Sequence, residues 1–342
     1  MNLILRQVLR VSALFLLVLA WIAAPAEAAS AQTKLKVVTS ITILQDIARN
    51  VAGDAVELSS IVPTDGDAHE FEPTPDDIRK VADANLIFVN GAGLEGFIDG
   101  LIADSGTQAT VITASAGLPI REFGAEEEGE AHADELAAGY LGVSGSFDCG
   151  SHTHEEGEAE HGGCDPHLWQ DPTNIIVYTI NIRDALIAAD PANADAYRSN
   201  AAKYIVALKE LDKSIWQGIS SIPVEKRILV TNHDALGYWA GRYGFQIAGI
   251  VLPGGGTSAE PSPQEVAALV DSIRQLGVPA IFTENIANNR LAQQIADEAG
   301  IQVVQSLYTD ALSAADGPAS TYLNMMNYNL MVIVSALGGS SS

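Results

Sequence analysis

The sequence has few basic residues, and this shortage limits what the protein can bind. Of its 342 residues only 18 are Lys or Arg, against 43 Asp or Glu, so the formal net charge is −25. A nucleic-acid partner would require a basic face, and this charge balance argues against one. The excess of acidic residues favours a cationic ligand through long-range attraction, although acidic surfaces also serve solubility.

Long apolar runs are absent except near the N-terminus. There a run from Val11 to Ala24 follows Arg6 and Arg10 and precedes the small-residue sequence Ala26-Glu27-Ala28. This order is typical of a secretory signal peptide, so we predict that residues 1–28 are a signal peptide cleaved after Ala28. Because no cysteine stands directly after the predicted cleavage site, we expect a soluble, exported protein in the periplasm without a lipid anchor.

Cysteine is scarce too, with only two in the chain. Cys149 and Cys164 are expected to form a disulfide, the default in an exported protein. Such a bond would close a short loop and stabilise the fold by about 3 kcal/mol on the chain-entropy estimate. Zinc ligation by the two cysteines beside His152 and His154 is the alternative.

Motifs for nucleotides and for zinc hydrolysis are incomplete or missing. Residues Gly91–Gly96 have the spacing G-x-G-x-x-G, but no acidic residue ends the next predicted strand,. Gly254–Thr257 lacks the lysine of a phosphate-binding loop,. We interpret the glycines of the first motif as tight-turn and packing residues and the second motif as a mobile turn. No H-E-x-x-H sequence is present.

The sequence does contain a regular alternation of strand and helix patterns, which indicates parallel sheets covered by helices. The expected strands are Leu35–Ser40, Val56–Val62, Leu86–Asn90, Thr110–Thr113, Arg227–Thr231, Phe245–Val251, Ala280–Thr283 and Gln302–Val304. The expected helices are Ile43–Val51, Pro75–Ala82, Leu94–Ile102, Pro172–Ala189, Asp234–Tyr243, Ser262–Leu276, Asn288–Ala299 and Ala319–Leu337.

A long amphipathic segment divides this alternation into two halves. Its apolar residues keep a helical spacing for about seven turns after Pro191,. We therefore predict an α/β fold with an N-terminal lobe (29–190), one rigid linking helix (191–221) and a C-terminal lobe (222–342). Residues 121–165 interrupt the first lobe with an acidic, glycine-rich and His-rich segment, which we expect to be a mobile loop because it cannot form a core.

Four side chains with metal-binding chemistry occur in similar places. His69 follows a strand in a loop closed by Pro73, and His167, His233 and Asp310 lie where a strand ends or a helix begins. Ligands of open α/β sheets bind at the carboxyl ends of strands. Two of the four residues come from each half, so we predict a site between the lobes. Three imidazoles and one carboxylate suit a tetrahedral Zn²⁺ ion.

Three of these four residues also have a purely structural interpretation. His167 can cap the helix that follows it, Asp310 can be a turn aspartate, and His233 can form a surface pair with Asp234. Glu284, just past a strand, is either a hydrogen-bond acceptor inside the cleft or a helix cap. We favour the metal site because all the structural interpretations would have to hold at once.

The sequences around these residues resemble the metal-binding solute receptors of bacterial ABC importers (cluster A-I, also called cluster 9), and most of all the zinc-specific members. The resembling stretches are His69–Pro73, Asp165–Pro172, Asn232–Tyr238, Tyr308–Ser313 and Tyr322–Asn329. The resemblance implies two Rossmann-like lobes, a rigid linking helix and one transition-metal ion at the lobe interface. It implies His69, His167, His233 and Asp310 as the ligands.

The implied function is a periplasmic receptor that captures Zn²⁺ and delivers it to an ABC permease without catalysis, and we expect a monomer. A manganese or iron receptor is the rival within the family, where some members have a carboxylate at the position of His233 or water at that of Asp310. A zinc hydrolase is a more distant alternative, because three ligands and a water make a catalytic site. Asp310 would occupy the water's place.

Zinc members often carry an acidic His-rich loop, which corresponds here to the segment with His132, His152, His154 and His161. Three roles stay open for it: an accessory metal site, a docking segment for a periplasmic zinc chaperone, or solvated filler. Imidazoles without a rigid frame would bind zinc only weakly.

Overall fold

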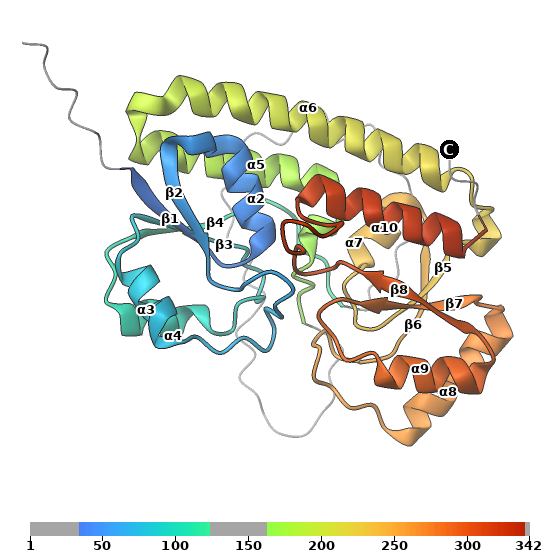
Figure 1. Cartoon of the computed structure of the whole chain (residues 1–342). Coiled ribbons are helices and arrows are strands. Elements are labelled where there is room, and N and C mark those ends of the chain that lie inside the picture. Colours follow the sequence, from blue (N-terminus) through green and yellow to red (C-terminus); the bar gives the residue numbers. More distant parts are fainter. Residues whose placement is uncertain (1–33, 124–162, 339–342) are drawn as a thin grey trace, which may run out of the picture. The chain divides into compact units, whose positions relative to one another are not determined.

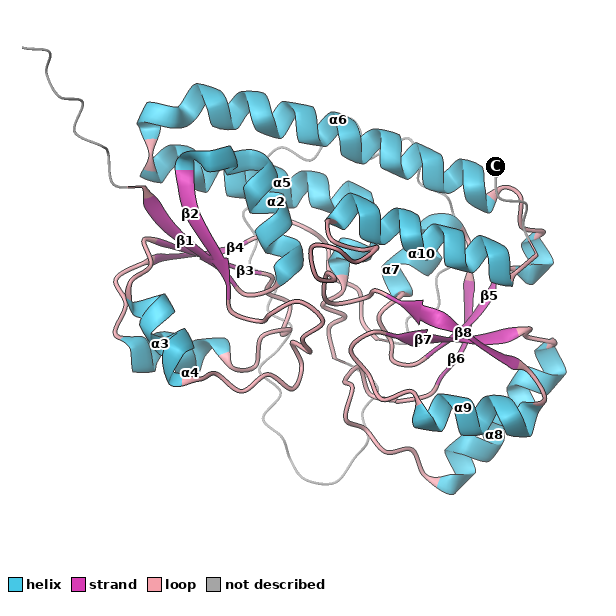
Figure 2. Cartoon of the chain, viewed as in Figure 1, coloured by secondary structure: helices cyan, strands magenta, loops and turns pink. Residues whose placement is uncertain are grey.

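The structure, a computed structural model, describes residues 34–123 and 163–338 and confirms the predicted α/β class. The first sheet has the strand order β2-β1-β3-β4 and the second the order β6-β5-β7-β8, and all neighbouring strands are parallel (Figure 2). The strands are β1 (Leu35–Thr39), β2 (Val56–Ser60), β3 (Leu86–Val89), β4 (Thr110–Thr113), β5 (Ile228–Thr231), β6 (Gln246–Ile250), β7 (Ala280–Glu284) and β8 (Gln302–Leu307). Each sheet with its own helices is called a lobe below.

Helices connect the strands and join the two lobes (Figure 1). They are α2 (Thr42–Ala52), α3 (Pro75–Ala82), α4 (Ile98–Ser105), α5 (Pro172–Ala189), α6 (Ala194–Ile219), α7 (Gly237–Tyr243), α8 (Pro263–Leu276), α9 (Arg290–Ala299) and α10 (Tyr322–Ala336). The long helix α6 contacts α2 and α5 of the N-terminal lobe and α10 of the C-terminal lobe. A 3₁₀ turn over Pro191–Asn193 precedes α6, so the α-helix begins at Ala194 rather than at Pro191.

One hydrophobic core extends under α6 into both lobes. It contains the largest fully buried side chains of the described residues, among them Trp169, Tyr178, Tyr197, Trp239 and Tyr322. Burying one such side chain contributes roughly 1.5–3 kcal/mol. Trp169 and Tyr322 are hydrogen-bonded across the lobe interface. Separating the lobes would expose these two side chains to water, so the shared core opposes separation.

Several helices start later than their apolar patterns predict, and for two of them, α4 and α7, the structure shows the reason. The helix predicted over Leu94–Ile102 begins at Ile98 because the Glu95 carboxylate accepts hydrogen bonds from the backbone N–H groups of Asn90 at 2.6 Å and Gly91 at 3.1 Å. These bonds hold the preceding residues in a turn. The helix predicted from Asp234 begins at Gly237, because the residues before it form the turn that follows His233.

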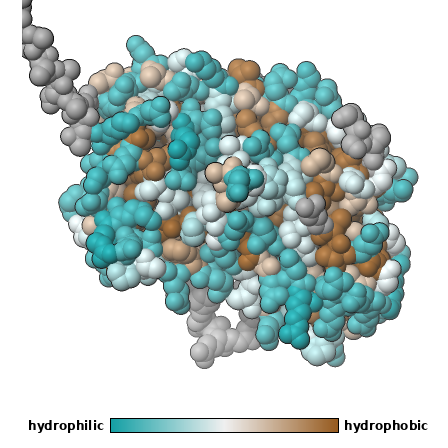
Figure 3. Space-filling view, in the orientation of Figure 1, coloured by the Kyte–Doolittle hydropathy of each residue, from teal (hydrophilic) through white to brown (hydrophobic). Residues whose placement is uncertain are grey.

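On the face drawn in Figure 3, hydrophilic and hydrophobic residues are interspersed over both lobes. The exposed large hydrophobic residues lie on different elements: Val111, Val206, Val224, Leu276 and Met331. Among the described helices, none has the length and apolarity needed to cross a membrane.

The glycine-rich turn after β3 gives a test of the packing interpretation. Gly91 has φ +84°, and a Cβ atom there would lie 2.5 Å from Thr113 Cγ2, whereas Gly93 has φ +81° and no neighbour within 4 Å. We expect Gly93→Ala to lower the free energy of unfolding by about 1 kcal/mol through backbone strain alone. Gly91→Ala should lower it by about 2–4 kcal/mol, because a steric clash is added. Urea denaturation of both variants measures the difference, and equal losses would contradict a packing role for Gly91.

Candidate metal centre

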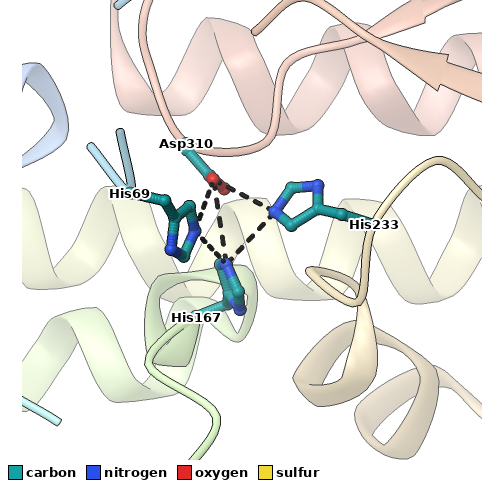
Figure 4. Close-up of side chains that lie close together, drawn as sticks. All are labelled: His69, His167, His233 and Asp310. Carbon is teal, nitrogen blue, oxygen red and sulfur yellow. Dashed lines mark hydrogen bonds and ion pairs between the residues drawn. The ribbon is translucent and has the colours of Figure 1, made fainter. Parts of the chain in front are cut away.

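The structure brings the four predicted ligand residues together at the interface of the lobes (Figure 4). His69 lies in the loop after β2, His167 immediately before a 3₁₀ turn that leads to α5, His233 after β5 and Asp310 after β8. One ligand atom of each residue lies within 4.8 Å of the others. The side chains of His167, His233 and Asp310 are fully buried, and that of His69 is 12% exposed.

The distances between the ligand atoms fit a tetrahedral ion. The Nε2 atom of His167 lies 3.2 Å from that of His69 and 3.3 Å from that of His233. Asp310 Oδ2 lies 3.3, 3.7 and 3.1 Å from the Nε2 atoms of His69, His167 and His233. With zinc–nitrogen and zinc–oxygen bonds of about 2.0–2.1 Å, the edge of a tetrahedron is roughly 3.3 Å. Five of the six edges are therefore close to those of a zinc tetrahedron, and the sixth, between His69 and His233, is at most 4.8 Å.

A carboxylate holds the ring of His167. Asp165 Oδ1 accepts hydrogen bonds from the His167 backbone N–H at 2.9 Å and from Nδ1 of its ring at 2.8 Å. Arg121 donates to Asp165 Oδ2 at 2.9 Å and lies over the ring of Tyr238. A proton on Nδ1 leaves Nε2 free for a metal and fixes the orientation of the ring.

His233 has the same kind of support from the C-terminal lobe. Glu284, at the end of β7, accepts a hydrogen bond from the His233 backbone N–H at 2.9 Å, and its Oε2 pairs with Nδ1 of the ring. Oε2 also accepts from Thr309 Oγ1 at 2.9 Å, next to Asp310. Glu284 is thus the hydrogen-bond acceptor inside the cleft that the sequence allowed, and it links two ligand-bearing segments.

The structural interpretations of the ligand residues do not fit this geometry. Asp171, not His167, caps α5 by accepting from the Thr173 backbone N–H. His233 and Asp234 are both buried and so form no surface pair. Asp310 Oδ2 faces the imidazoles, while its Oδ1 is buried without a hydrogen-bond partner among the described residues.

The loop that carries Asp310 follows a strand of the C-terminal lobe but is fastened to the other lobe. The backbone carbonyl of Thr309 accepts hydrogen bonds from Trp169 Nε1 at 2.7 Å and Gln170 Nε2 at 2.9 Å. Further along, Thr42 Oγ1 on α2 accepts from the Leu312 backbone N–H at 2.9 Å. Asp310 is therefore held from both sides, a feature that the sequence did not reveal.

Several predicted residues lie outside the described part of the chain. These are His132, His152, His154, His161 and Cys149. Cys164 is described and carries no free thiol, and Glu122 and Cys164 form an isolated antiparallel bridge at the base of the predicted loop. The pairing of Cys149 with Cys164 and a metal role for the four histidines stay predictions.

The charges of the centre compensate one another. Burial by itself lowers the pKa of His167, but the carboxylates of Asp310 and Asp165 outweigh it and raise that pKa to about 9. Burial also opposes the charged form of His233, whose pKa Glu284 and Asp310 raise well above the usual value. Burial tends to raise the pKa of Asp310, yet the two imidazoles hold it well below its usual range. Without a metal, protonated imidazole therefore balances the buried Asp310 carboxylate.

Comparison with known proteins assigns this fold and centre to a family. Residues 37–336 match the family ZnuA, described as "Zinc-uptake complex component A periplasmic". The chain belongs to this family. Its members are metal-binding solute receptors of ABC importers, which supply an inner-membrane permease.

Curated relatives and solved structures carry the names of several metals. The chain is 34% identical over 307 residues to the iron-binding protein YfeA of Yersinia pestis, covering 89% of this chain and 87% of the relative. It is 33% identical over 309 residues to the manganese ABC transporter substrate-binding lipoprotein PsaA of Streptococcus pneumoniae, covering 90% of each. The periplasmic zinc-binding protein TroA of Treponema pallidum superposes with a TM-score of 0.73 at 26% identity, over 89% of this chain and 99% of that one.

The raised pKa of His167 predicts that protons oppose metal binding. A metal that binds Nε2 must displace a proton while Nδ1 stays protonated, and His233 also has a raised pKa, so the apparent affinity should keep rising with pH up to at least about pH 9,. At pH 7 we expect the release of about one proton or more per zinc ion. Titration calorimetry in two buffers of different ionisation enthalpy counts these protons. Binding at pH 7 without proton release would show that the imidazoles are already neutral.

Proposed function

We propose that this protein is an exported receptor that captures Zn²⁺ and hands it to its ABC permease. The observation that carries the proposal is the set of three Nε2 atoms and one Oδ2 atom, of which five of the six separations lie near the edge of a zinc tetrahedron,. Carboxylates hold Nδ1 of two of the three rings, which favours a stable coordination geometry,. We propose no chemical step, since Asp310 takes the fourth position that a catalytic water would need.

The donor chemistry favours zinc over manganese. Imidazole nitrogen suits zinc, whereas manganese sites contain mostly carboxylate, carbonyl and water oxygens. Here His69, His167 and His233 supply nitrogen and only Asp310 supplies oxygen. A manganese ion at this centre would have to bind three nitrogens or recruit several water molecules into a largely buried site.

A manganese or iron receptor is the second candidate, because relatives covering most of the chain bear those names. The protein is also proposed to differ from relatives named lipoproteins by having no lipid anchor. Its only cysteines are Cys149 and Cys164, far from the predicted cleavage site. Its monomeric state and a periplasmic chaperone partner stay predictions.

The metal assignment predicts a single tight zinc site that depends on His69. We expect one zinc equivalent per chain. His69→Ala should lower the zinc affinity by more than about a hundredfold, because losing a metal ligand weakens binding more than losing a residue that only hydrogen-bonds to a ligand. Trp169 lies edge-on to His167 with ring centroids 5.3 Å apart, so its fluorescence can follow the titration. Tight binding that survives His69→Ala would contradict the four-ligand set.

Selectivity needs a separate measurement, because zinc binds most sites more tightly than manganese. X-ray absorption spectroscopy of the protein loaded with each metal reports the number of ligands. We expect zinc with four nitrogen and oxygen neighbours, and manganese, if it binds, with additional water oxygens. The exported protein is then purified from cells grown with both ions, and the metal that it retains identifies the cargo. Retained manganese would favour the second candidate.

The acidic segment should be dispensable for the tight site. Deletion of residues 126–160, combined with Cys164→Ser so that no unpaired thiol remains, removes His132, His152 and His154 and leaves all four ligands in place. We expect this variant to keep one tight zinc equivalent, with any weaker equivalents lost. Loss of the tight equivalent, measured by the same titration, would place part of the main site in that segment.

A further inference from the structure

His69 is the least supported of the four ligands. Its side chain is 12% exposed, whereas those of His167, His233 and Asp310 are fully buried. Carboxylates pair with Nδ1 of His167 and of His233. Among residues 34–123 and 163–338, none forms such a pair with Nδ1 of His69. The position of the His69 ring therefore depends on its backbone.

That backbone is held by one carboxylate with two partners. Asp67 Oδ1 accepts a hydrogen bond from the His69 backbone N–H at 2.9 Å. The other oxygen of the same carboxylate, Oδ2, accepts from Thr257 Oγ1. Thr257 belongs to the C-terminal lobe, so Asp67 connects the His69 loop directly to the opposite lobe. Hydrogen bonds to a carboxylate are stronger than those between neutral groups.

Thr257 is the last residue of the glycine turn Gly254–Thr257, which follows β6. This turn lacks the lysine of a phosphate-binding loop, so nucleotide binding does not account for its glycines,. Gly254 and Gly255 have φ +90° and +76°, a conformation that side chains other than glycine rarely adopt. Gly255 is buried against Phe123, where a Cβ atom would lie 2.5 Å from the ring. The Phe123 ring lies edge-on to His167 with centroids 6.2 Å apart. The turn thus contacts the centre at two places.

We propose that Asp67 and Thr257 are positioning residues that keep His69 on the metal, so that the glycine turn sets the rate of metal release. This inference rests on metal binding at the proposed centre and goes beyond it. The other three ligands are buried and fastened by their own contacts, whereas His69 can leave when Thr257 withdraws from Asp67. A small movement of the turn is then sufficient to open the site while the shared core stays intact.

Thr257→Val tests the proposal, since valine keeps the shape of threonine and removes the donor. Stopped-flow mixing of the zinc-loaded full chain with excess chelator measures the dissociation rate. We expect dissociation about tenfold faster in Thr257→Val, with an association rate within about twofold of wild type. The visible spectrum of the Co²⁺ form should stay that of a four-coordinate ion, because no ligand is lost.

Ser258→Ala is the matched control in the same turn. Ser258 Oγ donates to Glu70 Oε1 at 2.8 Å on the exposed surface, and Glu70 does not hold the His69 backbone. Its dissociation rate should stay within about twofold of wild type. A tenfold effect of both variants would show that the turn acts without the Asp67 link and would overturn the proposal.

A double-mutant cycle with Asp67→Asn decides whether the two residues act through each other. If they do, Thr257→Val should accelerate dissociation far less in the Asp67→Asn background than in wild type. Additive effects, or a wild-type rate in Thr257→Val, would overturn the inference and leave the zinc receptor intact. Failure of the wild-type chain to bind zinc would instead overturn the proposed function itself.

Discussion

The hydrophobic core beneath α6 is the constraint on which the metal centre depends. Helices of both lobes contribute to it, and side chains such as Trp169 and Tyr322 are completely buried there. Tyr322 also donates a hydrogen bond to the backbone carbonyl of Trp169 at 2.7 Å, across the lobe interface. Wide opening would break this core, at roughly 1.5–3 kcal/mol for each large side chain exposed. The fold therefore favours release through loops over separation of the lobes.

The attachment of the Asp310 loop to the N-terminal lobe also opposes separation of the lobes. By sequence, each half supplies two ligands, and a simple opening would divide the site evenly. In the structure, Trp169, Gln170 and Thr42 of the N-terminal lobe all bind the loop that carries Asp310. Glu284 binds the same loop from the other side through Thr309. Asp310 thus joins the two lobes, and its loop would resist their separation.

Local rules were sufficient to predict the fold and to single out the four candidate ligand residues, which the structure brings together. Strand and helix periodicity predicted both sheets, and the ends of strands marked His69, His233 and Asp310. Contacts distant in sequence had no such local pattern: Glu284 and His233 are 51 residues apart, and Thr257 and Asp67 are 190 apart. The late start of α4 escaped prediction for a related reason, because a buried carboxylate, Glu95, holds the preceding turn against the helical tendency of its sequence.

Charge balance explains how so polar a centre can be buried both with and without its metal. An isolated buried carboxylate would be costly, and Asp310 is fully buried,. Without metal, protonated His167 and His233 offset its charge, and their own partners Asp165 and Glu284 stabilise them. When a divalent cation binds, it takes over this role as protons leave. The two outer carboxylates then stay paired with Nδ1 protons, so the exchange changes the charge at the ligand atoms while the surrounding hydrogen bonds remain. A site built this way can gain and lose its ion without rearranging the core, and the exchange is left to the one ligand, His69, that has no such partner.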